Sequence, residues 1–453
     1  MSTHTQQPAR PQVQPAPEWT FPTPRQVELA NGMTALVLDV PGQHVISVRA
    51  SLPLPLRAEP REKEGVAWLM AGLLDEGTVA HSQRELAELL ESRGIGFGAG
   101  MGESALGVDL DVPSRHLGDA LALMTQMIAT PAFDPAEVAR AVRTRLQDIE
   151  QERASAGHRA MRELSATYYA EETRASRPAQ GSADTVGGLT RADVADFHAA
   201  HVRPAGGTVV VAGDLTGVEV DRLLEETIGA WSPEPSGERW QRAAAPRAVD
   251  SVRVVLVDRP GSVQSELALA TTGPDRRSPA WPAAPVMGWV VGGAPGARID
   301  QVLREEKGYT YGIRAGFRPR QVGGMMVVSG SVRADATVDS LRLLREILTG
   351  VGDGFTEEET RAGVDFVTLT APGRYDTADQ LADELARLAA DGLPLTFSSD
   401  TVAAMRELTP ADLDRAWRDE VGRDWTIVVV GDAKSYRDEV EALDLGPVTV
   451  VPA

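Results

Sequence analysis

The strongest constraint on the fold is an internal repeat. LTRADVADFHAAHV at 189–202 recurs as LTPADLDRAWRDEV at 408–421, and TVVVAGD at 208–214 recurs as TIVVVGD at 426–432. A third pair, ISVRASLPL from Ile46 and SELALATTG from Ser265, has the same spacing of about 219 residues. Matched segments at one spacing indicate a duplicated unit. The sequence therefore predicts an α+β fold of two homologous halves.

Turn and composition signals place the boundaries of these halves. Asn31-Gly32 lies between alternating apolar residues and predicts a tight hairpin turn. The Pro/Gln-rich start predicts a disordered tail, and SPEPSGERWQRAAAPRA reads as a linker. We expect a tail at 1–19, an N-terminal half at 20–231, a linker at 232–248 and a C-terminal half at 249–453.

Composition excludes several kinds of chemistry. The 453 residues include no cysteine, which excludes disulfides, thiolate metal sites and a cysteine nucleophile. A net charge of -20 argues against binding nucleic acid or an anionic membrane. No apolar run approaches the roughly 20 residues that span a bilayer, and the first residues lack the apolar core of a signal peptide. We expect a cytoplasmic protein.

The segment RIDQVLREEKGYTYGIRAGF predicts a helix, a cap and a strand. Apolar residues recur at helical spacing up to Lys307, and Gly308 can take the left-handed conformation that ends a helix. The alternation from Tyr309 to Phe317 is typical of a strand. Arg304 and Tyr311 could then converge on one point across the helix end. Alternatively, Arg304 complements the helix dipole and Tyr311 is an ordinary strand aromatic.

Five segments in order resemble the pitrilysin/insulinase family of inverzincins, specifically its mitochondrial-processing-peptidase-like branch. They are LANGMTALVL, GVAWLMAGLLDEGT, LTRADVADFHAAHVRPAGGTVVVAGD, VDRPGSVQSELAL and VVGGAPGARIDQVLREEKGYTYG. The resemblance covers about Arg25 to Val450. It implies that each half is an antiparallel-dominated sheet with packed helices, and that the halves form a clam-like chamber for peptides.

The chain departs from this family at the zinc motif. Active members carry H-x-x-E-H on the helix that here reads WLMAG, where two histidines hold zinc and the glutamate activates water. Those positions are Trp68, Ala71 and Gly72, none of which can bind a metal or accept a proton. The family's third ligand is a glutamate on a later helix, and the resemblance places its nearest equivalent at Asp148 or Glu150. We therefore expect no metal on this chain and a solvated role for both carboxylates.

Other sites for metal or nucleophilic chemistry have weaker support. His198 and His201 are three residues apart on an expected helix and could share a metal, but Asp196 points elsewhere and no third ligand is evident. GGAPG at 292–296 lacks the Lys-Ser/Thr of a phosphate-binding loop, and no G-x-S-x-G elbow occurs. We do not expect a metal or nucleotide site at these positions.

The same resemblance gives the Arg/Tyr segment a function. Family members carry an arginine and a tyrosine seven residues apart, and this chain is similar, with Arg304, Gly308 and Tyr311. Some members of the branch are heterodimers in which one subunit supplies zinc and the other the Arg/Tyr pair. The chain then resembles the second subunit, inactive alone, with zinc expected on a homologous partner and a peptide as substrate. A non-catalytic scaffold and a peptide-binding protein of the same fold are the alternatives.

Overall fold

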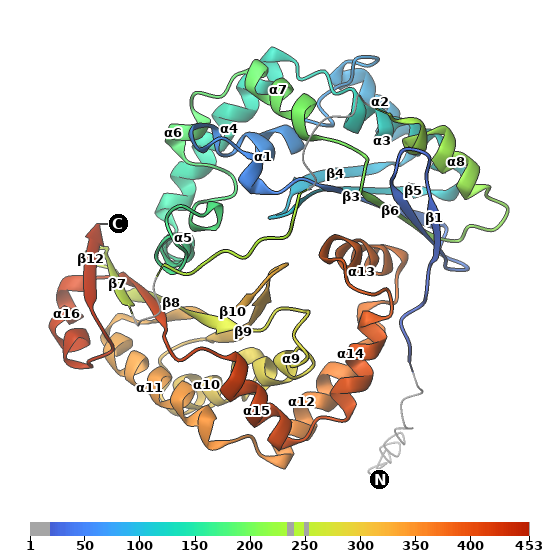
Figure 1. Ribbon diagram of the computed structural model, residues 1–453. Coiled ribbons are helices and arrows are strands. Elements are labelled where there is room, and N and C mark those ends of the chain that lie inside the picture. Colours follow the sequence, from blue (N-terminus) through green and yellow to red (C-terminus); the bar gives the residue numbers. More distant parts are fainter. Residues whose placement is uncertain (1–18, 233–239, 249–252, 453) are drawn as a thin grey trace, which may run out of the picture.

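The computed structural model describes residues 19–232, 240–248 and 253–452. These residues form two six-stranded sheets that face each other, each with helices packed against it (Figure 1). Of the predicted tail and linker, residues 1–18 and 233–239 lie outside the described ranges, as do 249–252 at the predicted start of the second half. Within the described part of the chain, no helix is both long enough and apolar enough to span a bilayer.

The first sheet has the strand order β1-β2-β6-β3-β5-β4. Its strands are β1 (Arg25–Glu28), β2 (Thr34–Asp39), β3 (Val45–Pro53), β4 (Gly96–Met101), β5 (Ala105–Pro113) and β6 (Thr208–Gly213). The turn between β1 and β2 contains Gly32 at φ 84°, which confirms the predicted hairpin. β2 and β6 run parallel, and the other described pairs of this sheet are antiparallel.

The second sheet repeats this order as β12-β7-β11-β8-β10-β9. Its strands are β7 (Arg253–Asp258), β8 (Gln264–Gly273), β9 (Arg314–Pro319), β10 (Gly324–Arg333), β11 (Thr426–Gly431) and β12 (Val448–Pro452). The first strands of the two orders differ, because β1 runs antiparallel to its neighbour whereas β12 runs parallel to β7. Both sheets are mixed, with antiparallel pairs in the majority. The matching orders confirm the predicted duplication.

Each half carries a matching set of helices. In the first half these are α1 (Val66–Ala71), α2 (Gln83–Arg93), α3 (Leu117–Ala129), α4 (Pro135–Ala154), α5 (Ala156–Tyr168), α6 (Ala183–Val186), α7 (Arg191–His201) and α8 (Val220–Glu226). In the second they are α9 (Ala283–Gly288), α10 (Arg298–Asp300), α11 (Thr337–Gly350), α12 (Glu357–Leu369), α13 (Ala378–Asp391), α14 (Phe397–Arg406), α15 (Pro410–Glu420) and α16 (Ala433–Ala442).

Short helical turns connect these elements. Two are π-helical, η6 (Trp289–Gly293) and η7 (Gln301–Glu306). The others are 3-10 turns: η1 (Leu56–Ala58), η2 (Arg61–Lys63), η3 (Ser114–His116), η4 (Arg174–Ser176), η5 (Ile228–Ala230), η8 (Ala334–Ala336), η9 (Val351–Asp353) and η10 (Pro372–Arg374).

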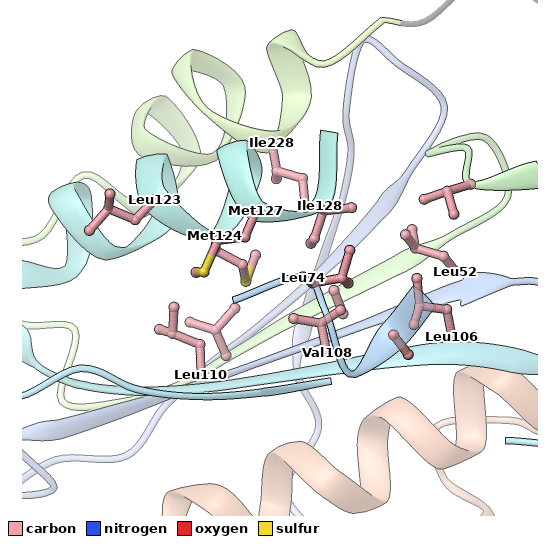
Figure 2. Close-up of a cluster of buried hydrophobic side chains, with 14 of the residues drawn as sticks. Leu52, Leu74, Leu106, Val108, Leu110, Leu123, Met124, Met127, Ile128 and Ile228 are labelled. Atoms are coloured by element: carbon pink, nitrogen blue, oxygen red, sulfur yellow. The ribbon is translucent and has the colours of Figure 1, made fainter. Parts of the chain in front are cut away.

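Each half has its own hydrophobic core between its sheet and the helices on one face. In the first half, alternate residues of β5, including Leu106, Val108 and Leu110, point toward α3 and meet Met124 and Met127 (Figure 2). Every second residue of β5 is thus buried, and these residues pack against the apolar face of α3. An equivalent core in the second half lies between the second sheet and α9, α11 and α15.

The opposite face of each sheet is covered by a helix from the other half. α5, in the sequence of the first half, packs Ala160 and Leu164 against Val257 and Ala268 of the second sheet. α13, in the second half, packs against β2 and β6 of the first sheet (Figure 1). α5 and α13 therefore lie between the two sheets and join the halves through apolar contacts.

Polar contacts, among them the following two, also join the halves. The buried Arg49 of β3 lies 2.6 Å from Asp383 of α13 and 3.1 Å from Asp111 of β5. Arg320, just after β9, pairs with Glu103, just after β4. The second pair joins the turns that follow the edge strands β4 and β9. The chamber itself stays a prediction.

Candidate functional site

The start of helix α1, where the zinc motif is expected, is held in place by a glycine turn and by backbone hydrogen bonds. Gly65 has φ 101°, and a Cβ there would lie only 2.8 Å from the carbonyl oxygen of Gln180, so glycine is required. The N–H groups of Gly65 and Ala67 each donate to the Glu59 carboxylate at 2.9 Å. The buried Glu59 carboxylate thus accepts hydrogen bonds from two backbone N–H groups that have no partner within α1.

Two arginines hold this carboxylate and its neighbour. Arg174 of η4 lies 2.8 Å from Glu59, whose side chain is 0% exposed. Arg177 lies 2.7 Å from Glu64, which Arg174 also approaches at 3.7 Å. Burial raises the pKa of Glu59, against the lowering effects of Arg174 and the two N–H donors. The network positions the start of α1.

A guanidinium occupies the space beside the degenerate motif. Arg145 of α4 is only 3% exposed, and its guanidinium carbon lies 5.7 Å from the centroid of the Trp68 ring. The same guanidinium donates to both carboxylate oxygens of Glu152, at 2.6 and 3.1 Å. This interaction lowers the pKa of Glu152. A cation–π contact to Trp68 and an ion pair to Glu152 therefore hold the Arg145 guanidinium beside α1.

The residues at this position do not fit a zinc ion. Ala71 is buried, Trp68 offers an indole, and Gly72 has no side chain. In the described part of the chain, no three His, Cys, Asp or Glu side chains are grouped so as to hold a metal. The nearby buried cation adds charge repulsion to this lack of ligands.

The carboxylate that pairs with the guanidinium beside α1 is neither Asp148 nor Glu150. Glu150 is exposed and pairs with Arg153 at 2.9 Å, in agreement with a solvated role, and Asp148 is half-buried. Glu152, at the end of the same LQDIEQE segment, pairs with Arg145, and the Arg145 guanidinium lies over the Trp68 ring of α1. Sequence reasoning missed this pair. The available signal was the seven-residue spacing of Arg145 and Glu152, two turns on one helix face.

Tyr311 lies on a loop in which the two preceding residues form hydrogen bonds with neighbouring elements. The Tyr309 N–H donates to the Leu303 carbonyl at 2.9 Å, and its hydroxyl donates to Asp339 at 2.9 Å. The Thr310 hydroxyl donates to the Ser331 carbonyl at 2.6 Å. Tyr311 itself is 95% exposed, and within the described residues its hydroxyl has no hydrogen-bond partner. The loop therefore presents a free phenol to solvent.

Arg304 lies on the π-helical turn η7, which ends before Gly308 at φ 63°. Its side chain is 42% exposed, and its described charged contact is with the adjacent Glu305 at 3.6 Å. That distance is long for a charge-assisted hydrogen bond, so the guanidinium retains free donors. π-Helical turns are uncommon and occur often at functional sites.

The structure corrects two details of this segment. The predicted strand from Tyr309 to Phe317 begins only at Arg314, because Thr310, Ile313 and neighbouring groups bond to β10 and to Asp300 instead of forming a ladder. The predicted regular helix is α-helical for one turn and π-helical thereafter. Among described residues, no hydrogen bond joins Arg304 to Tyr311. The role of the pair stays a prediction.

The two histidines of α7 are engaged separately. His198 Nε2 lies 2.8 Å from the Ile128 carbonyl, and its ring packs against Phe133. Burial lowers the pKa of His198. The His201 ring instead packs against Phe197 and Trp240. Their rings therefore serve packing between α7 and its neighbours.

Two family models match most of the chain. Residues 55–179 match the model described as "Insulinase (Peptidase family M16)", and residues 188–365 match the one described as "Peptidase M16 inactive domain". The chain belongs to the M16 peptidase family. The resemblance to insulinase-type proteins is thereby confirmed, whereas the narrower branch stays a prediction.

Relatives of this M16 chain include proteins named as zinc proteases. It is 24% identical over 352 residues to an uncharacterized zinc protease of Mycobacterium tuberculosis, covering 77% of this chain and 80% of that protein. It is 27% identical over 264 residues to an uncharacterized zinc protease of Streptomyces coelicolor, covering 57% of each.

Solved structures share the fold. The crystal structure of a peptidase M16 inactive domain from Pseudomonas fluorescens matches with a TM-score of 0.82 and 22% identity, over 90% of this chain and 98% of that one. A protease from Helicobacter pylori matches with a TM-score of 0.81 and 15% identity, over 91% and 100%. At these identities the likeness concerns the fold alone.

Proposed function

We propose that this chain is the non-zinc-binding subunit of a heterodimeric zinc metallopeptidase that cleaves peptides. Zinc, its ligands and the general base belong to a homologous partner with an intact H-x-x-E-H motif. This chain contributes Arg304 and Tyr311, which bind the substrate and stabilise the oxyanion.

The observation that carries the proposal is the contrast between the two predicted sites. At α1, a position that the resemblance assigns to a zinc ligand holds Trp68, and the buried Arg145 lies over its ring. At the Arg/Tyr segment, Tyr311 is almost fully exposed on a loop whose neighbouring residues are bound down. An exposed aromatic residue on an ordered loop is a common feature of binding sites.

The chemistry of amide hydrolysis explains what such a pair contributes. Attack on a peptide carbonyl places negative charge on its oxygen, and fixed hydrogen-bond donors lower the barrier by stabilising that charge. The Arg304 guanidinium supplies a permanent cation with several N–H donors, and the Tyr311 hydroxyl supplies a neutral donor. Both groups retain free donors, so a substrate carbonyl can accept from them.

The test is Tyr311→Phe in the complex of this chain with its zinc-bearing partner, assayed on a cleavable peptide. Removing one oxyanion donor typically lowers kcat by about 100- to 1,000-fold. We expect a loss of that order with the complex intact by native mass spectrometry. Tyr309→Phe is the matched control, because the Tyr309 hydroxyl is used by Asp339 and its loss should leave turnover nearly unchanged.

Two results would contradict the proposal. A rate unchanged by Tyr311→Phe would remove this phenol from the mechanism. A chain that forms no complex with a zinc-bearing homologue would favour a scaffold role.

A peptide-binding protein is the second candidate, and the exposed edge strand β4 favours it. Among described strands, β4 pairs only with β5, which leaves its outer N–H and C=O groups free to pair with an extended peptide. Its glycines Gly98 and Gly100 have open space where side chains would stand. Such a protein binds peptides alone, without zinc or a partner, which distinguishes it from the leading proposal.

A further inference from the structure

A cavity of about 470 Å³ lies in the second half, away from the Arg/Tyr segment. It is bounded by α11, α15, the loop at 422–425 that follows α15, and the turn after α16. We call it the tryptophan cavity because Trp417 and Trp425 both line it. Its volume lies within the usual range of small-molecule sites, roughly 300–1,000 Å³.

The walls of the tryptophan cavity are apolar. Leu341 and Leu348 of α11 and Val421 lie beside Trp417, and all four side chains belong to the core of the second half. Trp425 is half-buried and adds a second indole. Two indoles beside branched aliphatic groups favour a flat aromatic ligand.

The remaining lining residues give the cavity a cationic mouth. Arg345, Arg418 and Arg423 line it, against the single carboxylate of Asp444. Arg345 donates to the Leu443 carbonyl at 2.7 Å. Among the described residues, Arg418 and Arg423 have neither an ion pair nor a side-chain hydrogen bond. Both guanidiniums can therefore pair with an anionic ligand.

Helix dipoles explain the presence of two of these arginines. α11 and α15 both end near the mouth, and arginines near helix C-termini complement the partial negative charge there. Arg345 and Arg418 belong to these helices. Arg423 lies in the loop beyond α15, outside either helix, so no helix terminus accounts for its presence at the mouth.

We propose that the tryptophan cavity binds a small amphipathic anion, an aromatic carboxylate whose ring lies against the two indoles and whose carboxylate meets Arg423. A planar guanidinium and a carboxylate form two parallel hydrogen bonds, which gives the site its preference for anions. Neither Arg304 nor Tyr311 lines the cavity. The inference is therefore independent of the proposed peptidase role.

The experiment is isothermal titration of the full chain with 2-naphthoate and, separately, with neutral 2-naphthol. We expect 2-naphthoate to bind at one site per chain and at least tenfold more tightly than 2-naphthol. Arg423→Gln should weaken 2-naphthoate binding at least tenfold and leave 2-naphthol binding unchanged. Arg437→Gln is the matched control, because Arg437 lies on α16 outside the cavity and pairs with Glu441.

The opposite outcomes overturn the proposal. No saturable 2-naphthoate binding means that the cavity is a packing feature only. Equal affinity for the two probes, or an Arg423→Gln variant that binds 2-naphthoate as the parent does, means that no anion site exists at this mouth. Circular dichroism of each variant confirms that the fold is intact.

Discussion

The double substitution Trp68→His and Gly72→His tests why α1 does not bind zinc. It restores two histidines four residues apart, the spacing that directs both imidazoles to one metal. The new side chain at position 72 fits, because a Cβ there meets only the Trp68 and Leu69 carbonyls at 3.7 and 3.8 Å. If the missing imidazoles were the only defect, this variant would bind zinc.

The structure predicts that it will bind weakly because of Arg145. A zinc ion on this histidine pair would lie on the order of 6 Å from the guanidinium, where repulsion between charges of +2 and +1 amounts to about 5 kcal/mol at an effective dielectric constant of about 20. Glu152, 2.6 Å from Arg145, offsets roughly half of this. The remaining 2–3 kcal/mol, approximately, corresponds to a loss of about 30- to 150-fold in affinity.

Adding Arg145→Gln should recover that affinity. The third substitution removes the whole repulsion of about 5 kcal/mol while the Glu152 carboxylate remains, so we expect the triple variant to bind zinc roughly 1,000- to 5,000-fold more tightly than the double variant. Competition with a chromophoric chelator measures both affinities, and Arg145→Gln alone controls for non-specific binding. Equal zinc affinities in the double and triple variants would refute the reasoning.

Two further predictions concern stability. Glu59→Gln breaks a buried ion pair and should cost about 3–5 kcal/mol of unfolding free energy in urea, whereas the exposed Glu62→Gln should cost little. The Asp193 carboxylate accepts from Thr190 and Lys63, and these bonds lower its pKa to about 2. Its contribution is therefore full above pH 4 and lost as the pH falls toward 2, so Asp193→Asn should flatten that part of the acid unfolding profile. The exposed Asp196→Asn should leave the profile unchanged.

Local patterns predicted much of this fold. Asn31-Gly32 predicted the β1–β2 hairpin, and Gly308 predicted the end of the Arg304 helix. Both predictions succeeded because a backbone position with positive φ is usually occupied by glycine. The duplication followed from repeated segments, and the two sheets repeat one strand order.

The sequence pattern could not predict specific contacts between side chains. Arg145 and Glu152 lie on a charged face of α4, which the sequence alone predicts to face solvent. In the structure Trp68 of α1 packs against Arg145 on this face. The buried Asp300 accepts from Ile313 and Arg314 just before the π-helical turn at Arg304, and no periodicity predicts this contact. Sequence reasoning therefore located the candidate segments but not the contacts within them.

The exchange of α5 and α13 determines when the chain can finish folding. The face of the first sheet that carries Leu36 and Leu38 is complete once β6 is made, but the helix that covers it begins only at Ala378. During synthesis this apolar face stays open while more than 150 further residues emerge from the ribosome. The first sheet can therefore bury this face only after much of the second half has been synthesised.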